Sequence, residues 1–169
     1  SKVMVYIAAE FKEVELGASA GGGWTVDLSN VTYDSVSFSV TGQDVSPVGI
    51  RLNSDGTKMF MIGLASDNVF QYTLSTAFDL STASYNSVSF SVASQNTTPG
   101  GMYFNADGTK MYVIGNDDVV YQYSLSTAFD LSTASYDSVS FDASNQGTGM
   151  QGAVFNLDGT KMYMVDLAN

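Results

Sequence analysis

The chain has 169 residues, of which 44% are hydrophobic and only 14% are charged, and its formal net charge is −11. This length allows one domain with its own core, and the negative charge argues against binding to nucleic acid or to an anionic membrane, because both repel an acidic protein. Cysteine and histidine are absent, which excludes disulfides, thiolate nucleophiles, Cys-ligated metals and the commonest general base.

The first residues carry no recognisable targeting signal. Their short apolar run ends at Glu10, too early for a secretion signal, so a chain whose Ser1 follows a removed initiator methionine is expected to be made without a cleaved leader. No apolar run approaches the roughly 18 residues of a membrane-spanning helix. We therefore expect no membrane insertion.

Residues 1–23 differ in composition from the rest, because the only glutamates of the chain, Glu10, Glu13 and Glu15, lie there. The apolar stretch 3–7 is compatible with a β-strand that closes the fold, and residues 11–16 fit a strand or a short helix equally well. The three glycines at 21–23 are typical of a flexible joint. The segment is interpreted either as an anchor to a partner chain or as a degenerate first repeat.

From residue 24 to residue 169 the sequence repeats with a period of 51 to 52 residues. The dodecapeptide LSTAFDLSTASY stands at 74–85 and at 125–136, DGTKM begins at 55, 107 and 158, and SVSF begins at 35, 87 and 138. These matches define a partial repeat at 24–40, full repeats at 41–92 and 93–143, and a partial repeat at 144–169. Periods of this size indicate solenoids, arrays or propellers.

Each full repeat contains four strand-like stretches, which in the first one are residues 48–52, 58–62, 68–74 and 85–92. Asp55-Gly56 between the first two predicts a hairpin with a type I′ turn. The second stretch is apolar on both faces, whereas the fourth alternates with serine. This pattern predicts an all-β fold of the β-propeller type, with four-stranded antiparallel blades that bury Phe60 and Tyr112 between neighbours and place the fourth strand at the rim.

The dodecapeptide is predicted to join the third strand to the fourth around the outside of a blade. Phe78, Leu80 and Tyr85 are expected to anchor it, and the polar residues Asp79, Ser81 and Thr82 to satisfy the backbone of a tight turn. Its repetition then reflects equivalent packing sites rather than repeated active sites.

The stretches FNADGTKMYVIG at 104–115 and VYQYSLSTAFDLSTASY at 120–136, preceded by a Pro-x-Gly, resemble a class of β-propeller-like repeats. These repeats occur in large virion and tail-associated proteins of marine bacteriophages and in surface proteins of marine bacteria. The resemblance covers residues 24–169 and carries no catalytic motif. It implies a structural or adhesive role at a virion, an extracellular site or a cell surface.

The repeats amount to about three blades, whereas propellers typically have four to eight. The last unit ends after the apolar stretch 161–165, whose expected neighbouring strand is not encoded, and a bare apolar edge promotes aggregation. Three solutions stay open: a longer native protein, an open array on a larger assembly, or two chains that complete each other's partial blades to give six. Closure or burial by another chain is favoured, so the expected partners are a second copy or other virion or surface proteins.

No catalytic residue, cofactor or metal site is predicted. The repeated acids lie in predicted turns, and Asp-Gly-Thr-Lys lacks the ladder of oxygen ligands of a calcium loop. The best oxygen cluster for calcium is Asn116 with Asp117 and Asp118, but the preceding repeat does not keep it.

The loops that lead from one repeat to the next are predicted to share a face with the loops between the second and third strands, near the central channel where propellers usually bind ligands. The candidate ligand-binding residues there are Gln43, Asp44, Gln95, Asn96, Asn145 and Gln146. Such amides could hydrogen-bond a surface glycan; the alternative is that they cap backbone groups where blades meet. Trp24 is interpreted as a packing residue.

The leading interpretation is a non-enzymatic structural or adhesion module of a phage particle or cell surface. The alternatives are a glycan-binding propeller lectin and a hydrolase or lyase on a propeller scaffold. Carboxylates converging on the channel would favour the enzyme.

Overall fold

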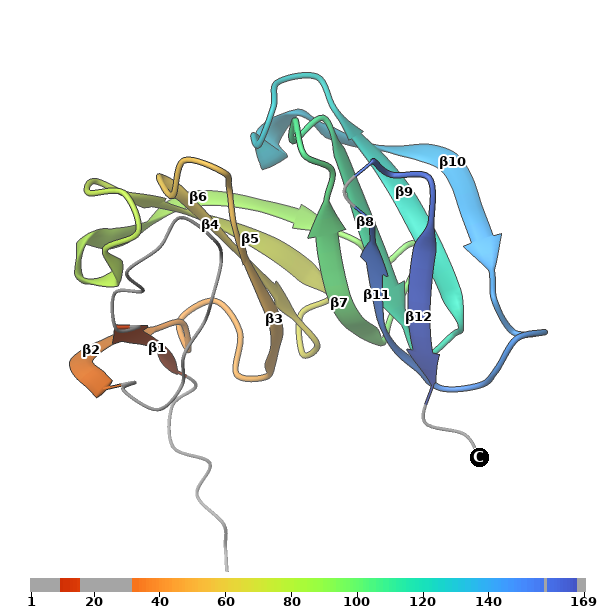
Figure 1. Ribbon diagram of the computed structural model, residues 1–169, viewed down its shortest axis with the longest axis horizontal. Helices are drawn as coiled ribbons and strands as arrows, with labels where there is room; N and C mark the ends of the chain where they lie inside the picture. Colours follow the sequence, from red (N-terminus) through yellow and green to blue (C-terminus); the bar gives the residue numbers. More distant parts are fainter. Residues whose placement is uncertain (1–9, 16–31, 157, 167–169) are drawn as a thin grey trace, which may run out of the picture.

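A computed structural model of the chain describes residues 10–15, 32–156 and 158–166, in which the regular elements are β-strands and two short 3-10 helices (Figure 1). The strands are β1 (Glu10–Glu15), β2 (Thr32–Ser39), β3 (Pro47–Leu52), β4 (Lys58–Gly63), β5 (Asn68–Leu74), β6 (Ala83–Ser91), β7 (Pro99–Phe104), β8 (Lys110–Gly115), β9 (Val119–Leu125), β10 (Ala134–Asp142), β11 (Met150–Phe155) and β12 (Met162–Asp166). The helices are η2 (Leu80–Thr82) and η3 (Leu131–Thr133). The stretch 3–7 and Trp24 lie outside the described residues.

The two full repeats each form a four-stranded antiparallel sheet. We call β3-β4-β5-β6 blade 1 and β7-β8-β9-β10 blade 2. The pairs β1-β2 and β11-β12 form two-stranded sheets, which we call the N-terminal and C-terminal half-blades. The half-blades lie at opposite ends of the array, with the two blades between them (Figure 1).

The half-blades correspond to different halves of a blade. In the N-terminal one, Glu10 lies opposite Ser39, as Asn68 lies opposite Ser91 between β5 and β6 of blade 1. Residues 10–15 therefore form a strand in the third position, which settles the choice between strand and helix for residues 11–15 of the stretch 11–16. The C-terminal half-blade holds the first and second strands, because DGTKM at 158–162 follows β11 as DGTKM at 55–59 follows β3.

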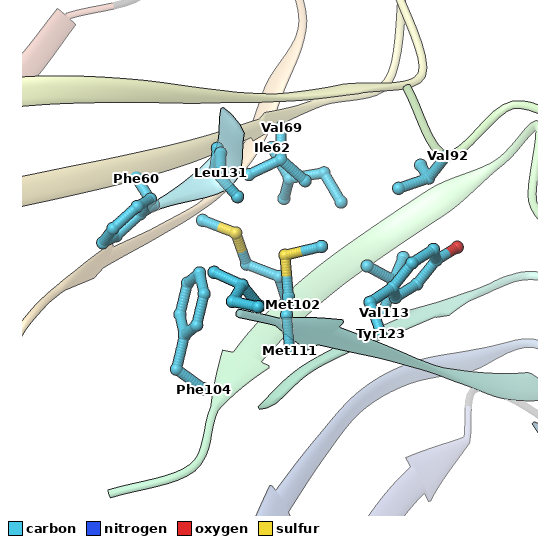
Figure 2. Close-up of a cluster of buried hydrophobic side chains, with 11 residues drawn as sticks. Phe60, Ile62, Val69, Val92, Met102, Phe104, Met111, Val113, Tyr123 and Leu131 are labelled. Carbon is cyan, nitrogen blue, oxygen red and sulfur yellow. The ribbon is translucent and has the colours of Figure 1, made fainter. Parts of the chain in front are cut away.

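The second strand of blade 1 is buried on both faces, as predicted. In β4, Met59 and Met61 contact the cluster shared with β2, while Phe60 and Ile62 contact the cluster between blades 1 and 2, which Figure 2 shows. Successive side chains of a strand point to opposite faces. One apolar run therefore serves two neighbouring sheets at once.

The prediction of burial is confirmed for Phe60, which is 0% exposed. It is wrong for Tyr112 as a fully buried residue: Tyr112 is only partly buried. Its ring packs on Phe155 of the C-terminal half-blade, with 4.5 Å between the centroids. Two strands cover this face of blade 2 less completely than a four-stranded neighbour covers Phe60.

The fourth strand is half-exposed, but its alternation is not continuous. In β6, the register shifts between the pairs formed by Tyr85 and Val88, and Ser87 in between has a φ of 61°. Ser35 and Ser138 occupy the same place in the other repeats and also have positive φ. Each copy thus contains a β-bulge, which bends the strand and increases its twist.

The Asp-Gly hairpins form at the predicted places with a different turn. A type I′ turn needs positive φ at two successive residues, but Gly56 alone has it, at 72°. The Gly56 N–H donates to the Asn53 carbonyl at 3.1 Å, and Asp55 accepts from the Thr57 N–H at 2.9 Å. The turn therefore closes at the glycine itself, and the Asn53 side chain extends it by accepting from the Lys58 N–H at 2.9 Å.

The dodecapeptide docks onto the preceding sheet rather than only passing around its own blade. In the second copy, Leu131 is 1% exposed in the cluster between blades 1 and 2 (Figure 2). The Leu131 N–H donates to Gln71 Oε1 at 2.9 Å, and Lys58 Nζ donates to the Phe129 carbonyl at 2.7 Å. The repeated peptide is therefore a connector between neighbouring sheets.

The predicted anchors and turn residues of the first copy behave unequally. Leu80 is buried and Tyr85 is half-buried, but Phe78 is 58% exposed, so Phe78 is not a buried anchor. Asp79 accepts from the Ser81 N–H at 3.0 Å, and the Thr82 hydroxyl donates to the Asp79 carbonyl at 2.8 Å. The polar residues thus close the tight turn, as predicted.

Candidate functional site

The loops that lead into each new sheet have one conformation, repeated along the array. In the first loop, the Gln43 and Asp44 N–H groups both donate to the Val40 carbonyl, at 2.9 and 3.0 Å. The same pair of bonds, from residues 95 and 96 and from residues 146 and 147, recurs at Val92 and Ala143. The sequence alignment of the three glutamines is therefore also a structural equivalence.

Two of these glutamines contact tyrosines of their own repeat. Gln43 Oε1 accepts from the Tyr72 hydroxyl at 3.3 Å, and Gln95 Oε1 accepts from the Tyr123 hydroxyl at 3.4 Å. Burial raises the pKa of both tyrosines well above its ordinary value, so both hydroxyls stay protonated and able to donate. Gln146 and Asn145 are exposed. Of the predicted amides, these two face solvent most fully.

The residues after Gln43 and Gln95, an acid and an amide, are buried and have a structural role. Asp44 is 3% exposed and accepts from the Ser46 N–H at 2.6 Å and from the Ser66 N–H at 2.8 Å. Ser66 lies in the turn between β4 and β5, so this carboxylate joins two loops of one face. A Cβ on Gly63 would collide with the Asp44 side chain, which explains why glycine ends β4.

Asn96 does the same in blade 2 with a different polar group. It is 2% exposed, accepts from the Thr98 N–H at 2.8 Å and donates from Nδ2 to Asp117 at 2.9 Å. A Cβ on Gly115 would collide with it. Asp44 and Asn96, both predicted to bind ligand, therefore hold the loops instead.

The C-terminal half-blade shows the same contact with the residues exchanged. The loop position is Gly147 and the strand position is Asp166, and a Cβ on Gly147 would collide with the Asp166 carboxylate. One polar side chain fills this space in each repeat. The loop supplies it in blades 1 and 2, and the strand end supplies it in the C-terminal half-blade. This equivalence was missed from sequence, although the aligned repeats contain it.

The expected oxygen cluster at 116–118 binds protein donors. Asp117 accepts from the Tyr121 hydroxyl at 2.8 Å as well as from Asn96. Buried Asp118 accepts from the Met150 N–H at 2.8 Å and so links blade 2 to the C-terminal half-blade. Among the described residues, no group of three acids is close enough to hold a metal ion.

The equivalent link after blade 1 cannot form, because proline replaces methionine. Asp67 corresponds to Asp118, and Pro99 to Met150. Proline has no N–H, and Asp67 Oδ1 is a buried atom without a hydrogen-bond partner among the described residues.

The Tyr121 hydroxyl also has a raised pKa. Burial, followed by the hydrogen bond to Asp117, raises its pKa to about 12. The group is a hydrogen-bond donor at neutral pH rather than a general base. In the described part of this face, most of the polar groups named here bind one another.

Comparison with known proteins shows the fold class. No family model and no curated protein matches the chain. Its fold is similar to two solved proteins described as candidate 6-phosphogluconolactonases, one from Bacteroides fragilis (TM-score 0.56, 14% identity, 71% of this chain and 32% of that chain) and one from Bacteroides uniformis (0.54, 13%, 71% and 33%). It is also similar to a functionally unknown protein from Desulfotomaculum acetoxidans (0.54, 15%, 79% and 40%). The fold is of the all-β, propeller type, and the chain spans less than half the length of these neighbours.

Proposed function

We propose that the chain is a non-enzymatic structural or adhesion module of a phage particle or cell surface, with other protein chains as its partners. The observation that carries this proposal is the internal use of the polar loop face. Asp44 and Asn96 are buried and tie loops together, and Asp118 binds a backbone N–H of the next sheet. An active site needs such groups free to meet a substrate.

The repeated acids support the same proposal. Asp55, Asp107 and Asp158 each accept hydrogen bonds from the threonine two residues later, and these bonds lower the pKa of each carboxyl. A carboxyl with a lowered pKa is a poor general acid or base near neutral pH. Their recurrence follows from turn formation.

The experiment is a direct comparison with the reaction named for two of the fold neighbours. Purified chain is incubated with 6-phosphogluconolactone, and loss of the lactone is followed against buffer and against heat-unfolded chain. We expect the same rate in all three. Hydrolysis above the buffer rate that Asp117→Asn abolishes would overturn the proposal in favour of the hydrolase.

A glycan array tests the lectin alternative on the exposed amides. The wild type is compared with the double variant Asn145→Ala/Gln146→Ala, which alters only exposed side chains. Binding that the double variant loses would place glycan recognition on this face and replace a purely structural role. Equal signals from both proteins support the proposal.

A further inference from the structure

Five of the exposed large apolar side chains of the described residues lie at the two ends of the array. At the C-terminal end, Val154, Tyr163 and Val165 on β11 and β12 are 51 to 61% exposed. At the N-terminal end, Val48 and Leu52 on β3 are 38% and 43% exposed. Contiguous exposed apolar surface commonly marks an interaction site.

These two ends match the two sides of an interface inside the chain. Tyr163 corresponds in the repeat to Phe60, and Leu52 corresponds to Phe104. Phe60 and Phe104 pack together between blades 1 and 2, with ring centroids 4.6 Å apart and at most 8% exposure. The ends therefore carry complementary halves of a contact that this sequence already makes.

A cavity beside the C-terminal half-blade matches the site where the dodecapeptide docks. Its volume is about 150 Å³, and its lining includes Tyr112, Gln122, Val139 and Phe141. In the repeat these correspond to residues 60, 71, 88 and 90, which surround the connector of blade 2.

The polar residues at this cavity are also equivalent to those that hold the connector. Gln71 and Lys58 bind the backbone of residues 131 and 129. Their counterparts, Gln122 and Lys110, both donate to Asp137 at 2.7 Å. The amide oxygen of Gln122 can still accept from a backbone N–H in this arrangement, because only its nitrogen is used as a donor there.

The strand edges complete the match. Among the described strands, β12 pairs only with β11, and β1 pairs only with β2. The C-terminal half-blade has the first and second strands and the N-terminal half-blade the third and fourth. Unpaired edges are ready to accept another strand.

We propose that two copies of this chain close a ring, in which the N-terminal half-blade of each copy joins the C-terminal half-blade of the other. Each chain gives two blades, and the two composite blades bring the total to six, within the usual four to eight. The register of β4 and β5 then places Val165 of one copy opposite Phe11 of the other. Leu52 and Tyr163 become buried against each other.

A second copy also carries the sequence motif of this connector. Asp27-Leu28-Ser29 lies between β1 and β2 in the chain and repeats the Asp-Leu-Ser of 79–81 and 130–132. Leu131 of the latter is the buried residue of the docked connector.

The first test uses complementary charges. Light scattering of the wild type should give twice the 18.0 kDa of one chain. Leu52→Lys alone and Tyr163→Glu alone should each give a single chain, because each ring would bury two unpaired charges. An equimolar mixture should regain the double mass, since one junction is then wild type and the other pairs lysine with glutamate.

The control is Val45→Lys, a change at a residue that is 74% exposed and lies in the loop between β2 and β3, outside the strands that form the proposed junctions. It should keep the double mass, and circular dichroism should show that all variants fold. A wild type of single mass, a series of ever larger masses, or a mixture that stays single would each overturn the closed ring.

The second test reads the register directly in a chain without native cysteine. Phe11→Cys/Val165→Cys should form disulfides between chains under mild oxidation, because strand neighbours lie within disulfide reach. Lys12→Cys/Val165→Cys is one residue out of register and should cross-link much less. Equal or absent cross-linking in both variants would overturn the pairing of β1 with β12.

The proposal of a ring rests on the proposed role as an assembly module, and it identifies the partner as a second copy of the chain. The two ideas fail separately. If the chain has a single mass and neither lactonase nor glycan-binding activity, only the ring is refuted. If a two-chain ring hydrolyses the lactone, only the proposed function is refuted.

Discussion

Truncation of Phe60 to alanine should remove much of the stability of the array. The side chain is 0% exposed, and its ring lies 4.6 Å from that of Phe104 and 6.3 Å from that of Phe129. Removing a buried phenylalanine costs about 3–5 kcal/mol, which combines the lost burial and the cavity left behind. With a slope of about 2 kcal/mol per molar urea, the unfolding midpoint should fall by roughly 1.5–2.5 M.

The assay is urea unfolding followed by circular dichroism, with two comparison variants. Tyr112→Ala should cost less than Phe60→Ala, because the equivalent tyrosine is only partly buried against the C-terminal half-blade. Val45→Ala should stay within about 0.5 kcal/mol of the wild type, as exposed substitutions usually do. An unchanged midpoint for Phe60→Ala would refute the burial of β4 between two sheets.

Three further outcomes are expected. Gly159→Ala should cost about 1–2 kcal/mol of unfolding free energy, because the alanine must adopt a left-handed φ of +69° but has open space around it. Gly56→Ala should cost more, because its φ is +72° and a phenylalanine ring also occupies the space of the added Cβ. Equal urea midpoints for the two variants would contradict this. Gly147→Asp should lose about 1–3 kcal/mol by overpacking, and adding Asp166→Gly should restore stability by recreating the arrangement of the first repeat; a double variant no better than the single one would disprove the exchange. At pH values below about 3.8 the melting temperature should decrease, because the Asp-Gly turn carboxyls, whose pKa is lowered in the folded chain, become protonated. It should decrease again from about pH 10 to 12, because the pKa of Tyr121 is raised in the folded chain and the unfolded chain therefore ionises first. A melting temperature that stays constant across either range would contradict the assignment.

The repeat and its strands could be predicted from sequence, because both are local patterns. The predicted stretch 68–74 is β5 as observed, and the Asp-Gly pairs mark each hairpin. Apolar residues on both faces of 58–62 correctly indicated two neighbouring sheets. Each of these signals depends only on side-chain alternation and turn residues.

The features that were missed depend on partners far away in the sequence. The positive φ of Ser87 lies within an alternating stretch that reads as an uninterrupted strand. The docking of Leu131 on Gln71 joins residues 60 positions apart. Neither a bulge nor a contact between sheets has a fixed local signature, so alternation alone could not reveal them.

The equivalence of the loops that hold the candidate site could be predicted from sequence, but the contacts of their side chains could not. The equivalence of residues 43, 95 and 146 is real, yet the buried partners of Asp44 and Asn96 show that this face is held together by its own polar groups. The signal that could have shown it is the exchange of glycine and acid between positions 147 and 166. Three aligned copies in one chain act as a small alignment.

The same alignment of the repeats accounts for the exposed apolar residues at the ends of the array. A residue in an inner repeat packs against a neighbouring sheet. Its copies in the outer units have a side chain of similar shape, which would fit such a neighbour. Tyr163 retains an aromatic ring where Phe60 has one, although Tyr163 is 55% exposed and Phe60 is buried. An exposed ring contributes little to the stability of a lone chain. Its presence at this position is explained if the last unit, like the inner ones, packs against another sheet, which is the role that the second copy would fill.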